Sequence, residues 1–256
     1  MNGRTGTPGS TADHRLVTMT DLFSVAADNA ATMWLKLGAA RGYEPVHGDG
    51  FIAVSGADRQ GRRIMTLAER SDLGAIRDLV HSAPGRVVVE DPFGTVPVAD
   101  ITDRLSVRQM PVMARHGKPA LAAPSMPVRR ASGSADLRTA ERLITTGFAL
   151  ENFLPWRPGE AFPDALADDP AVAFFIAERD GDPAGACLTV TDDAATGFYW
   201  VTTMPEHRSR GVGRALMHGA IAELRPDVVT LVASIAGRPL YESMDFDLLG
   251  VSSWWS

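Results

Sequence analysis

The chain has 256 residues, of which 45% are hydrophobic and 22% charged, a composition typical of a soluble globular protein with one large or two ordinary domains. Its formal net charge of -6 at pH 7 argues against a broad cationic surface for nucleic acid or for an anionic membrane. The single cysteine, Cys187, excludes an intramolecular disulfide and a cysteine-rich zinc site, and we expect no metal.

Residues 1–15 lack the apolar core that a signal peptide needs, and no later run of apolar residues reaches the length of a membrane span. One cysteine in the whole chain suits a reducing compartment. We therefore expect a disordered leader at residues 1–15 on a cytoplasmic protein without a membrane segment.

The first half begins with a predicted amphipathic helix at residues 21–42, because apolar side chains recur there at helical spacing. Its apolar face consists of Phe23, Ala26, Ala30, Trp34 and Leu37. A hairpin turn at 48–50 follows, then strands at 51–56, 62–68, 85–91 and 107–115, with a helix at 71–83. Glu90, Asp91 and Phe93 follow an apolar strand. They could face a cleft to which the first half contributes a wall, but we interpret them as part of a solvated loop. Residues 116–127 are rich in proline, glycine and alanine and predict a linker, with a domain boundary near residue 125.

The second half alternates strands and helices. Helices are predicted at 135–147, 211–224 and 237–244, and strands at 171–179, 184–193, 197–204, 228–235 and 246–255. The turn at 180–183 predicts an antiparallel hairpin, whereas the alternation at the end of the chain predicts parallel pairing through crossover helices. The pattern therefore indicates a mixed sheet with helices on both faces.

The stretch "MPEHRSRGVGRALM", residues 204–217, lies between a predicted strand and a predicted helix. The helix begins near Gly211, because apolar residues from Val212 onward fall on one face. The first turn of a helix has free backbone N–H groups and the positive end of the helix dipole, which together favour a phosphate. Glycines let an anion approach these amides, and Arg208, Arg210 and Arg214 add positive charge. We therefore predict a pyrophosphate site.

Two common nucleotide motifs are absent. The sequence has no P-loop, and Leu216 occupies the place of the third glycine of a dinucleotide-binding fingerprint. The pattern Arg208-x-x-Gly211-x-Gly213 instead resembles the coenzyme A pyrophosphate loop of the GCN5-related N-acetyltransferase (GNAT) family. The later stretch "GRPLYESMDF" resembles the short tyrosine helix of that family, although Asp245 stands where relatives usually have glycine. The resemblance covers about residues 127–255.

The resemblance implies a GNAT-like α+β fold, with a mixed, mostly antiparallel sheet flanked by helices on both faces and present as two related domains. We expect residues 126–256 to form the acetyltransferase domain. Residues 16–125 lack an Arg-x-x-Gly-x-Gly stretch, and we interpret them as a degenerate GNAT-like copy without a cofactor.

The family binds acetyl-CoA between its fourth and fifth strands, so the resemblance implies acetyl-CoA as the acyl donor. Pantetheine would pair with the strand backbone as an added strand would. The implied cofactor-binding residues are Val201, Thr202, Thr203, Arg208, Ser209, Arg210, Gly211, Val212, Gly213, Arg214, Ser234 and Tyr241.

Tyr241 matches the family's general acid, which would protonate the departing thiolate of coenzyme A. Ser234 would bond pantetheine or relay a proton. The predicted strand at 197–204 has no carboxylate, although relatives often have a glutamate there, so the general base is open between Glu151, Glu178 and His207.

Large aromatic residues are predicted to form the acceptor pocket: Phe153, Trp156, Tyr199 and Trp200. At least one of Tyr199 and Trp200 is expected in the sheet core, because neighbouring strand residues point to opposite faces. The predicted function is N-acetyl transfer from acetyl-CoA to a primary amine, by direct attack on the thioester. The alternative is a non-catalytic acyl-CoA-binding sensor. Expected partners are acetyl-CoA and an amine, without nucleic acid or membrane, in a monomer or homodimer.

Overall fold

The computed structural model describes residues 18–148 and 150–256, so the leader predicted at residues 1–15 lies outside the described residues. The first half follows the predicted order closely. Its elements are α1 (Met19–Ala40), β1 (Val46–Gly48), β2 (Phe51–Ser55), β3 (Arg62–Thr66), α2 (Leu73–His81), β4 (Val87–Asp91), α3 (Val98–Ile101) and β5 (Val107–His116).

The second half also agrees with the predicted order of strands and helices. Its elements are β6 (Val128–Arg130), α4 (Gly133–Gly147), the 3-10 helix η1 (Glu151–Phe153), α5 (Asp164–Ala167), β7 (Val172–Arg179), β8 (Asp182–Thr191), β9 (Thr196–Thr203), the 3-10 helix η2 (Pro205–His207), α6 (Val212–Leu224), β10 (Val228–Val232), α7 (Arg238–Glu242) and β11 (Asp247–Trp255). The predicted hairpin between β7 and β8 is confirmed, with Asp180 and Gly181 in the left-handed conformation that such a turn requires.

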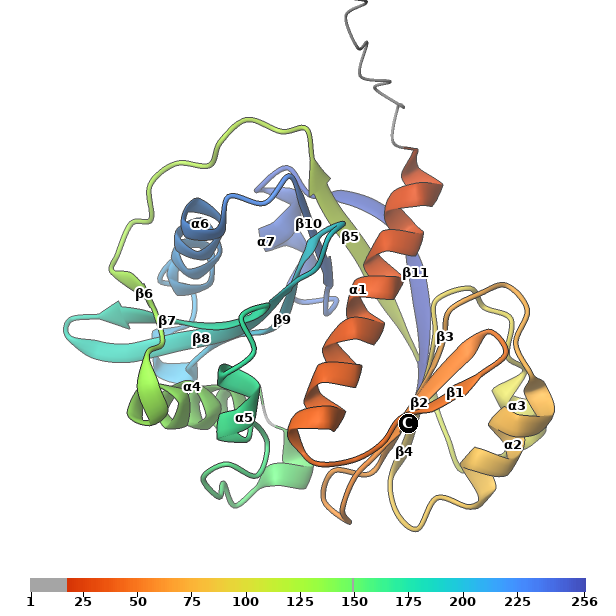
Figure 1. Cartoon of the computed structure of the whole chain (residues 1–256). Helices are drawn as coiled ribbons and strands as arrows, with labels where there is room; N and C mark the ends of the chain where they lie inside the picture. Colours follow the sequence, from red (N-terminus) through yellow and green to blue (C-terminus); the bar gives the residue numbers. More distant parts are fainter. Residues whose placement is uncertain (1–17, 149) are drawn as a thin grey trace, which may run out of the picture.

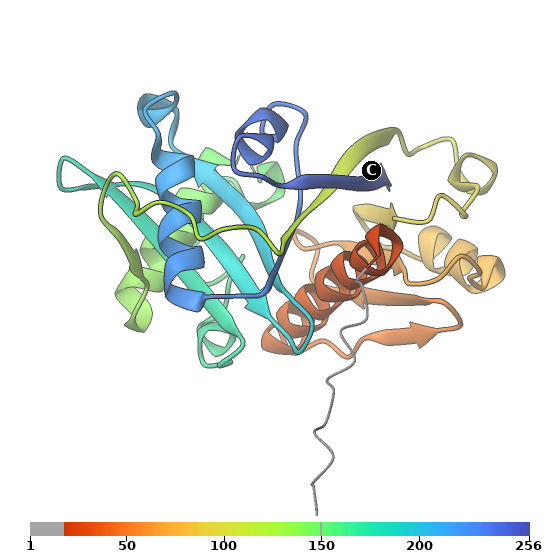
Figure 2. The same ribbon diagram turned by 90° about the horizontal axis from the view of Figure 1, so that it is seen from above.

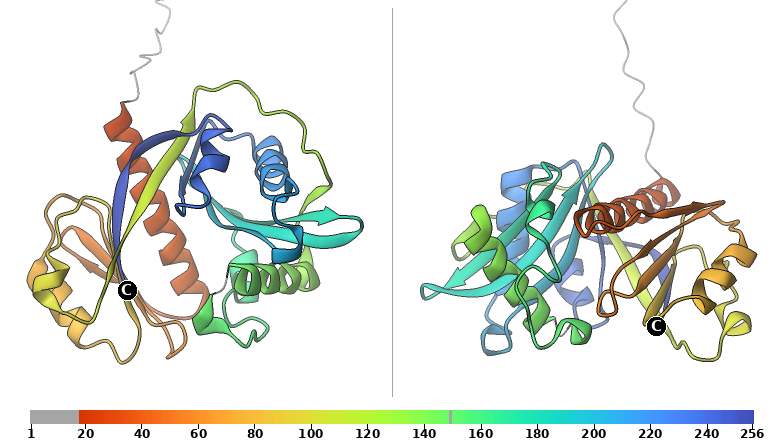
Figure 3. Two further views of the ribbon diagram at one scale, coloured as in Figure 1. Left: turned by 180° about the vertical axis from the view of Figure 1, so that it is seen from behind. Right: turned by 60° about the horizontal axis from the view of Figure 1, so that its bottom comes forward.

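Within the described residues, the strands form one 11-stranded sheet in the order β1-β2-β3-β4-β11-β5-β10-β9-β8-β7-β6. Parallel pairing of β9 and β10 is confirmed. The prediction that β11 pairs with β10 is wrong, because β5 lies between them and is antiparallel to both. Figure 3 shows β11 beside β5, reaching from the second half of the chain into the first. The sheet is therefore continuous across the predicted boundary, and the division into two related domains remains a prediction.

The connection between β5 and β6 runs without regular structure over residues 117–127, as the linker prediction requires. It passes alongside α6 (Figure 2), and its Leu121 and Met126 pack against the apolar core around that helix. The linker is therefore part of the wall of the second half.

Helices cover both faces of the sheet (Figure 1). On one face, α6 and α7 pack with β7, β9 and β10 around buried residues such as Phe175, Leu216 and Phe246. On the other face, α4, α5 and part of α1 pack around Phe162 and Ile176. The predicted fold class, a mixed and mostly antiparallel α+β sheet with helices on both faces, is confirmed.

Helix α1 joins the two halves, since it contacts β2 and β11 on one side and β8 and β9 on the other. The small residues Ala26, Ala27 and Ala30 are buried and let the helix lie close to the sheet. Asn29 is fully buried, donates to the carbonyl of Val190 at 3.2 Å and accepts from the hydroxyl of Tyr199 at 2.5 Å. These bonds fix α1 against the second half, because a buried amide without partners is costly.

No helix in the described ranges, 18–148 and 150–256, is both long and apolar enough to span a bilayer. The same residues contain no group of three or more His, Cys, Asp and Glu side chains arranged to hold a metal ion.

We expect residues 126–256, produced without the first half, to aggregate and to lack a cooperative unfolding transition. β10 would lose one neighbour and β11 would lose both, so long strand edges would be exposed. Size-exclusion chromatography and denaturant unfolding against the full chain would measure this. A monomeric fragment with cooperative unfolding would contradict it and would support the predicted boundary.

Candidate active site

Strands β9 and β10 pair only over a short stretch and then separate. Their register runs from Thr196–Val229 to Phe198–Leu231. Beyond that point β10 continues along β5, where Val232 pairs with Val112, while β9 continues along β8 as far as Thr203. In the described part of the chain, the edge of β9 from residue 199 to 203 therefore has no strand on its β10 side. Free backbone groups of this kind can bind an extended ligand.

A β-bulge lies in this open part of β9. Between the pairs Ala186–Thr202 and Leu188–Tyr199, β8 has one residue and β9 has two, and Trp200 adopts a positive φ of 49°. The hydroxyl of Thr202 donates to the carbonyl of Trp200 at 2.7 Å and supports the bend. Tyr199 and Trp200 consequently pack against the same core, with ring centroids 6.3 Å apart. The expectation that they point to opposite faces is wrong, because the bulge interrupts the alternation.

The predicted phosphate loop leads into α6 beside the open edge. Ser209 and Gly211 both have positive φ, 59° and 82°, and Gly211 is exposed. The N–H of Ala215 donates to the carbonyl of Gly211 at 2.9 Å, so the preceding amides of Val212, Gly213 and Arg214 have no carbonyl partner within the helix. A Cβ at Gly213 would lie 3.5 Å from the hydroxyl of Thr203, so the loop lies against the end of β9.

The three arginines of this loop differ in their contacts. Arg208 donates to the carbonyl of Gly147 at the end of α4, at 3.3 Å. Arg214 donates to Ser243 after α7, at 2.6 Å to the hydroxyl. Arg210 is exposed, and its side chain makes no hydrogen bond or ion pair within the described residues. Arg208 and Arg214 therefore fasten the loop to its neighbours, and Arg210 is the one of the three whose guanidinium is uncommitted in the described structure.

Tyr241 lies on α7, on the α6 side of the sheet. It is 8% exposed and packs against Phe246, with ring centroids 5.8 Å apart. Burial raises the pKa of its hydroxyl, and the nearby Cys187 adds to that shift. The hydroxyl makes no hydrogen bond within the described residues, and it remains protonated at neutral pH.

Ser234 follows β10 and is exposed. Its hydroxyl accepts from the N–H of Gly237 at 3.0 Å, which closes the turn into α7. An added Cβ at Gly237 would lie 3.1 Å from this hydroxyl and 3.4 Å from the Tyr241 ring, so the two side chains flank the same glycine.

The three candidates for the general base lie in different surroundings. Glu151 begins η1 and is exposed, and its carboxylate has no partner among the described residues. Glu178 is bound to Arg129 at 2.7 Å. His207 ends η2, and its Nδ1 is buried without a partner in the described part of the chain. Of the two glutamates, only Glu151 has an unpaired carboxylate.

Part of the second half is similar to a known family. Residues 170–248, from β7 into β11, match the family model described as "Acetyltransferase (GNAT) domain". The chain carries a GNAT acetyltransferase domain. The match covers the open edge of β9, the loop before α6 and the tyrosine helix, and it supports an N-acetyltransferase. The sequence matches no curated protein.

Solved structures share the fold over nearly the whole chain. A GCN5-related N-acetyltransferase from Kribbella flavida is similar with a TM-score of 0.61 and 13% identity, covering 90% of this chain and 95% of that one. A GCN5-related N-acetyltransferase-like protein from Streptococcus suis has a TM-score of 0.56 and 10% identity, covering 93% and 99%. A GCN5-related N-acetyltransferase from Sphaerobacter thermophilus has a TM-score of 0.51 and 17% identity, covering 80% and 76%. The fold of both halves is thus shared with these structures.

A cavity of about 100 Å³ lies where the two halves of the chain meet. Trp34, Leu37 and Arg41 of α1 line one side, and the region of β2–β4 lines another. Phe153, Phe162 and Trp200 complete it from the second half. Trp200 lies in the open edge of β9 and packs with Phe162 in the core opposite α6, so the cavity adjoins that edge on the face of the sheet opposite α6 and α7.

Two of the four predicted acceptor-pocket residues, Phe153 and Trp200, line this cavity. Tyr199 instead binds Asn29 of α1, and Trp156 is half-buried outside the lining. Leu150 and Asn152 line it, whereas Glu151 between them does not. The sequence analysis did not assign Trp34 and Arg41 to the pocket. The available signal was their spacing, because positions 34, 37 and 41 fall on one face of a helix.

Beside the cavity, Arg63 and Glu90 form a buried ion pair. Arg63 Nη1 lies 2.6 Å from Glu90 Oε1, which also accepts from Trp34 Nε1 at 3.1 Å. The Arg63 guanidinium stands 4.1 Å above the Trp34 ring. Burial raises the pKa of Glu90, and Arg63 opposes that shift. The interpretation of Glu90 and Asp91 as loop residues is wrong, because both are buried in β4.

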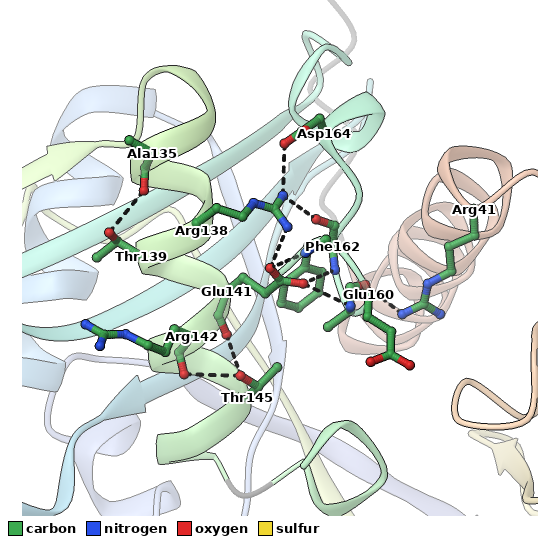
Figure 4. A network of polar contacts seen from close by, with 12 residues as sticks. Arg41, Ala135, Arg138, Thr139, Glu141, Arg142, Thr145, Glu160, Phe162 and Asp164 are labelled. Carbon is green, nitrogen blue, oxygen red and sulfur yellow. Dashed lines mark hydrogen bonds and ion pairs between the residues drawn. The ribbon is translucent and has the colours of Figure 1, made fainter. Parts of the chain in front are cut away.

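The cavity wall from the second half of the chain is held by one buried carboxylate. Glu141 of α4 is fully buried and accepts from the N–H groups of Gly159, Ala161 and Phe162 at 2.8, 2.9 and 3.0 Å. Arg138 completes the set at 2.5 Å (Figure 4). These bonds fix residues 159–162, which carry the Phe162 side of the cavity.

Replacing Glu141 by alanine is expected to lower the free energy of unfolding by about 3–5 kcal/mol, because three amides and a guanidinium lose their common acceptor. Denaturant unfolding followed by circular dichroism would measure the change. Glu223→Ala, an exposed glutamate on α6, is the control and is expected to stay within about 0.5 kcal/mol of the unmodified protein. Equal stability of the two variants would contradict a fastening role for Glu141.

Proposed function

We propose that the protein transfers an acetyl group from acetyl-CoA to the primary amine of a small molecule. In this reaction the C–S bond of the thioester breaks and a C–N bond to the amine forms. The amine loses a proton, and the departing thiolate gains one. The protein must therefore hold the thioester, place the amine in line, and supply and remove these protons.

The observation that carries this proposal is the position of the open edge of β9 beside the start of α6. The edge offers free backbone groups to the pantetheine amides, and the amides at residues 212–214 offer donors to the pyrophosphate. A left-handed, exposed Gly211 leaves space at the helix start, where an added Cβ has no neighbour nearer than 3.9 Å. The residues present thus fit the acyl donor.

The proton for the thiolate comes from Tyr241 in this proposal. Its hydroxyl is kept protonated by burial and has no competing partner among the described residues. Ser234 lies on the other side of Gly237 from the Tyr241 ring. Its hydroxyl closes the turn that positions α7 and so positions Tyr241. Removal of the amine proton is assigned to Glu151, directly or through water, because its carboxylate is exposed and unpaired in the described structure.

The setting of the reaction is also a proposal. A buried free thiol at Cys187 suits a reducing cytoplasm. The acidic net charge of -6 favours small-molecule partners over nucleic acid or an anionic membrane. The active unit is a monomer or a homodimer.

Gly211→Asp is expected to weaken acetyl-CoA binding about tenfold or more, because it places a carboxylate where the pyrophosphate belongs and about 1.4 kcal/mol of repulsion suffices for that factor. Isothermal titration calorimetry measures the affinity. Gly94→Asp is the matched control, since Gly94 also has a positive φ and open space around it but lies in the loop after β4. If both variants weakened acetyl-CoA binding equally, backbone strain would explain the loss and the predicted pyrophosphate site would not. If the unmodified protein did not bind acetyl-CoA, the proposal would be overturned.

Tyr241→Phe is expected to lower kcat by about 10²–10⁴-fold while the affinity for acetyl-CoA is retained, because only proton donation is removed. Coenzyme A release measured with a thiol reagent gives the rate, and calorimetry gives the affinity. An unchanged rate would remove Tyr241 from the mechanism. If the unmodified protein bound acetyl-CoA tightly but acetylated no amine, the alternative function, a non-catalytic acyl-CoA-binding sensor, would be favoured.

A further inference from the structure

The cavity between the two halves has an unusual charge. Four arginines line it: Arg41 from α1, Arg62 and Arg63 from β3, and Arg86 before β4. Only Arg63 has a carboxylate partner within the described ranges, which is Glu90. The glutamate of the neighbouring loop, Glu160, is bound by Arg59. Glu141 and Glu160 attract the Arg41 guanidinium electrostatically without forming an ion pair with it. Within the described ranges, Arg41, Arg62 and Arg86 therefore have no directly bound carboxylate.

Arg41 is the most poorly satisfied of these arginines. One guanidinium nitrogen donates to the carbonyl of Ala161 at 2.7 Å, and the side chain lies 5.5 Å from the Phe153 ring (Figure 4 shows its approach to this segment). Its Nε is buried without a partner in the described structure. Burial lowers the pKa of Arg41 to about 10, and it therefore keeps its charge at neutral pH. A buried cation without a counter-ion is unfavourable, and an anionic ligand would relieve that cost.

The remaining two arginines also have free capacity for an anion. Arg62 is bound to neutral groups at the end of α2, the carbonyl of Leu79 and the hydroxyl of Ser82. Arg86 makes one weak bond, 3.4 Å to the side-chain oxygen of Asn152. Both face neutral oxygens, so their charges add to the field in the cavity.

The other walls of the cavity are apolar and aromatic, with Trp34, Phe153, Phe162 and Trp200 among them. A volume of about 100 Å³ holds on the order of seven to ten water-sized groups, which corresponds to a molecule the size of an amino acid. The occupant best matched to these walls has one anionic group and a short apolar body.

We propose that the acceptor is a small amine that also carries a carboxylate, which binds at Arg41 while its amine is presented to the open edge of β9. This inference rests on the proposed acetyl transfer and names the substrate class for it. Trp200 connects the two places, because its side chain lines the cavity and its backbone lies in the bulge that precedes Val201. The arginines repel a protonated amine from the Arg41 end, which orients the molecule with its amine toward the sheet.

The test compares leucine with leucinamide, and aminohexanoate with diaminohexane, as acceptors at a fixed concentration of acetyl-CoA. Leucinamide has a neutral amide in place of the carboxylate of leucine, whereas diaminohexane has a second ammonium group in place of the carboxylate of aminohexanoate. We expect kcat/KM to be at least about tenfold higher for the carboxylated member, the factor that corresponds to one charge-assisted contact. The amide is the less basic amine and is more easily deprotonated, so this ionisation difference works against the expected result.

Arg41→Met is expected to raise KM for leucine at least about tenfold and to leave KM for leucinamide unchanged within about twofold. Arg142→Met is the matched control, because Arg142 is an exposed arginine of α4 whose guanidinium has no partner among the described residues. Thermal unfolding of both variants separates a folding defect from lost recognition.

Calorimetry measures binding to the cavity without turnover. The two ligands are the product N-acetylleucine and N-acetylleucinamide, each titrated in the presence of saturating coenzyme A. Preferential binding of N-acetylleucine that Arg41→Met abolishes supports the proposal. Competition between N-acetylleucine and coenzyme A would overturn it, because the arginines would then hold cofactor phosphates. Acetylation of amides and diamines without any preference for carboxylates would also overturn it and leave acetyl transfer intact. Failure to bind acetyl-CoA would instead reject the proposed function.

Discussion

The insertion of β5 between β10 and β11 is the constraint on which the rest of the structure depends. Val232 at the end of β10 pairs with Val112 of β5, so this end of β10 follows β5 and separates from β9. β9 stays paired with β8 as far as Thr203. The two strands diverge because each follows a different neighbour. The same strand pairs with β11, which pairs in turn with β4, so one set of backbone hydrogen bonds both opens the site and brings the first half beside it.

Two local departures from regular geometry then complete the site. The bulge at Trp200 keeps two successive aromatic side chains on the acceptor side and leaves Val201 to pack on the α6 side. The left-handed Gly211 turns the chain into α6 so that its first amides are free. Each departure costs conformational energy, and the surrounding sheet and helices must supply it. In the proposed function, the acyl donor and the acceptor would therefore lie on opposite faces of one strand.

Much of this arrangement could be predicted from the sequence. Helical spacing located α1, α4 and α6, and the glycine and arginine pattern at 208–214 identified the loop before α6, because these signals depend on residues close together in the chain. The place of β5 could not be predicted, because an apolar strand carries no mark of which edge it will join. Phe153 and Trp200 could be assigned to a pocket from the sequence, and both line the cavity. The place of Arg41 in its lining and the burial of Glu90 could not be predicted, because both depend on the packing of segments that are distant in the chain.

The interleaved sheet also bears on how the protein is made. β4 and β5 remain unjoined until residues 247–255 have been synthesised, because β11 is the strand that connects them. Contacts this distant in sequence form late and slow folding, and the unpaired edges are exposed in the meantime. Chaperones that shield strand edges therefore have their longest opportunity to act after the first half is complete and before β11 is docked.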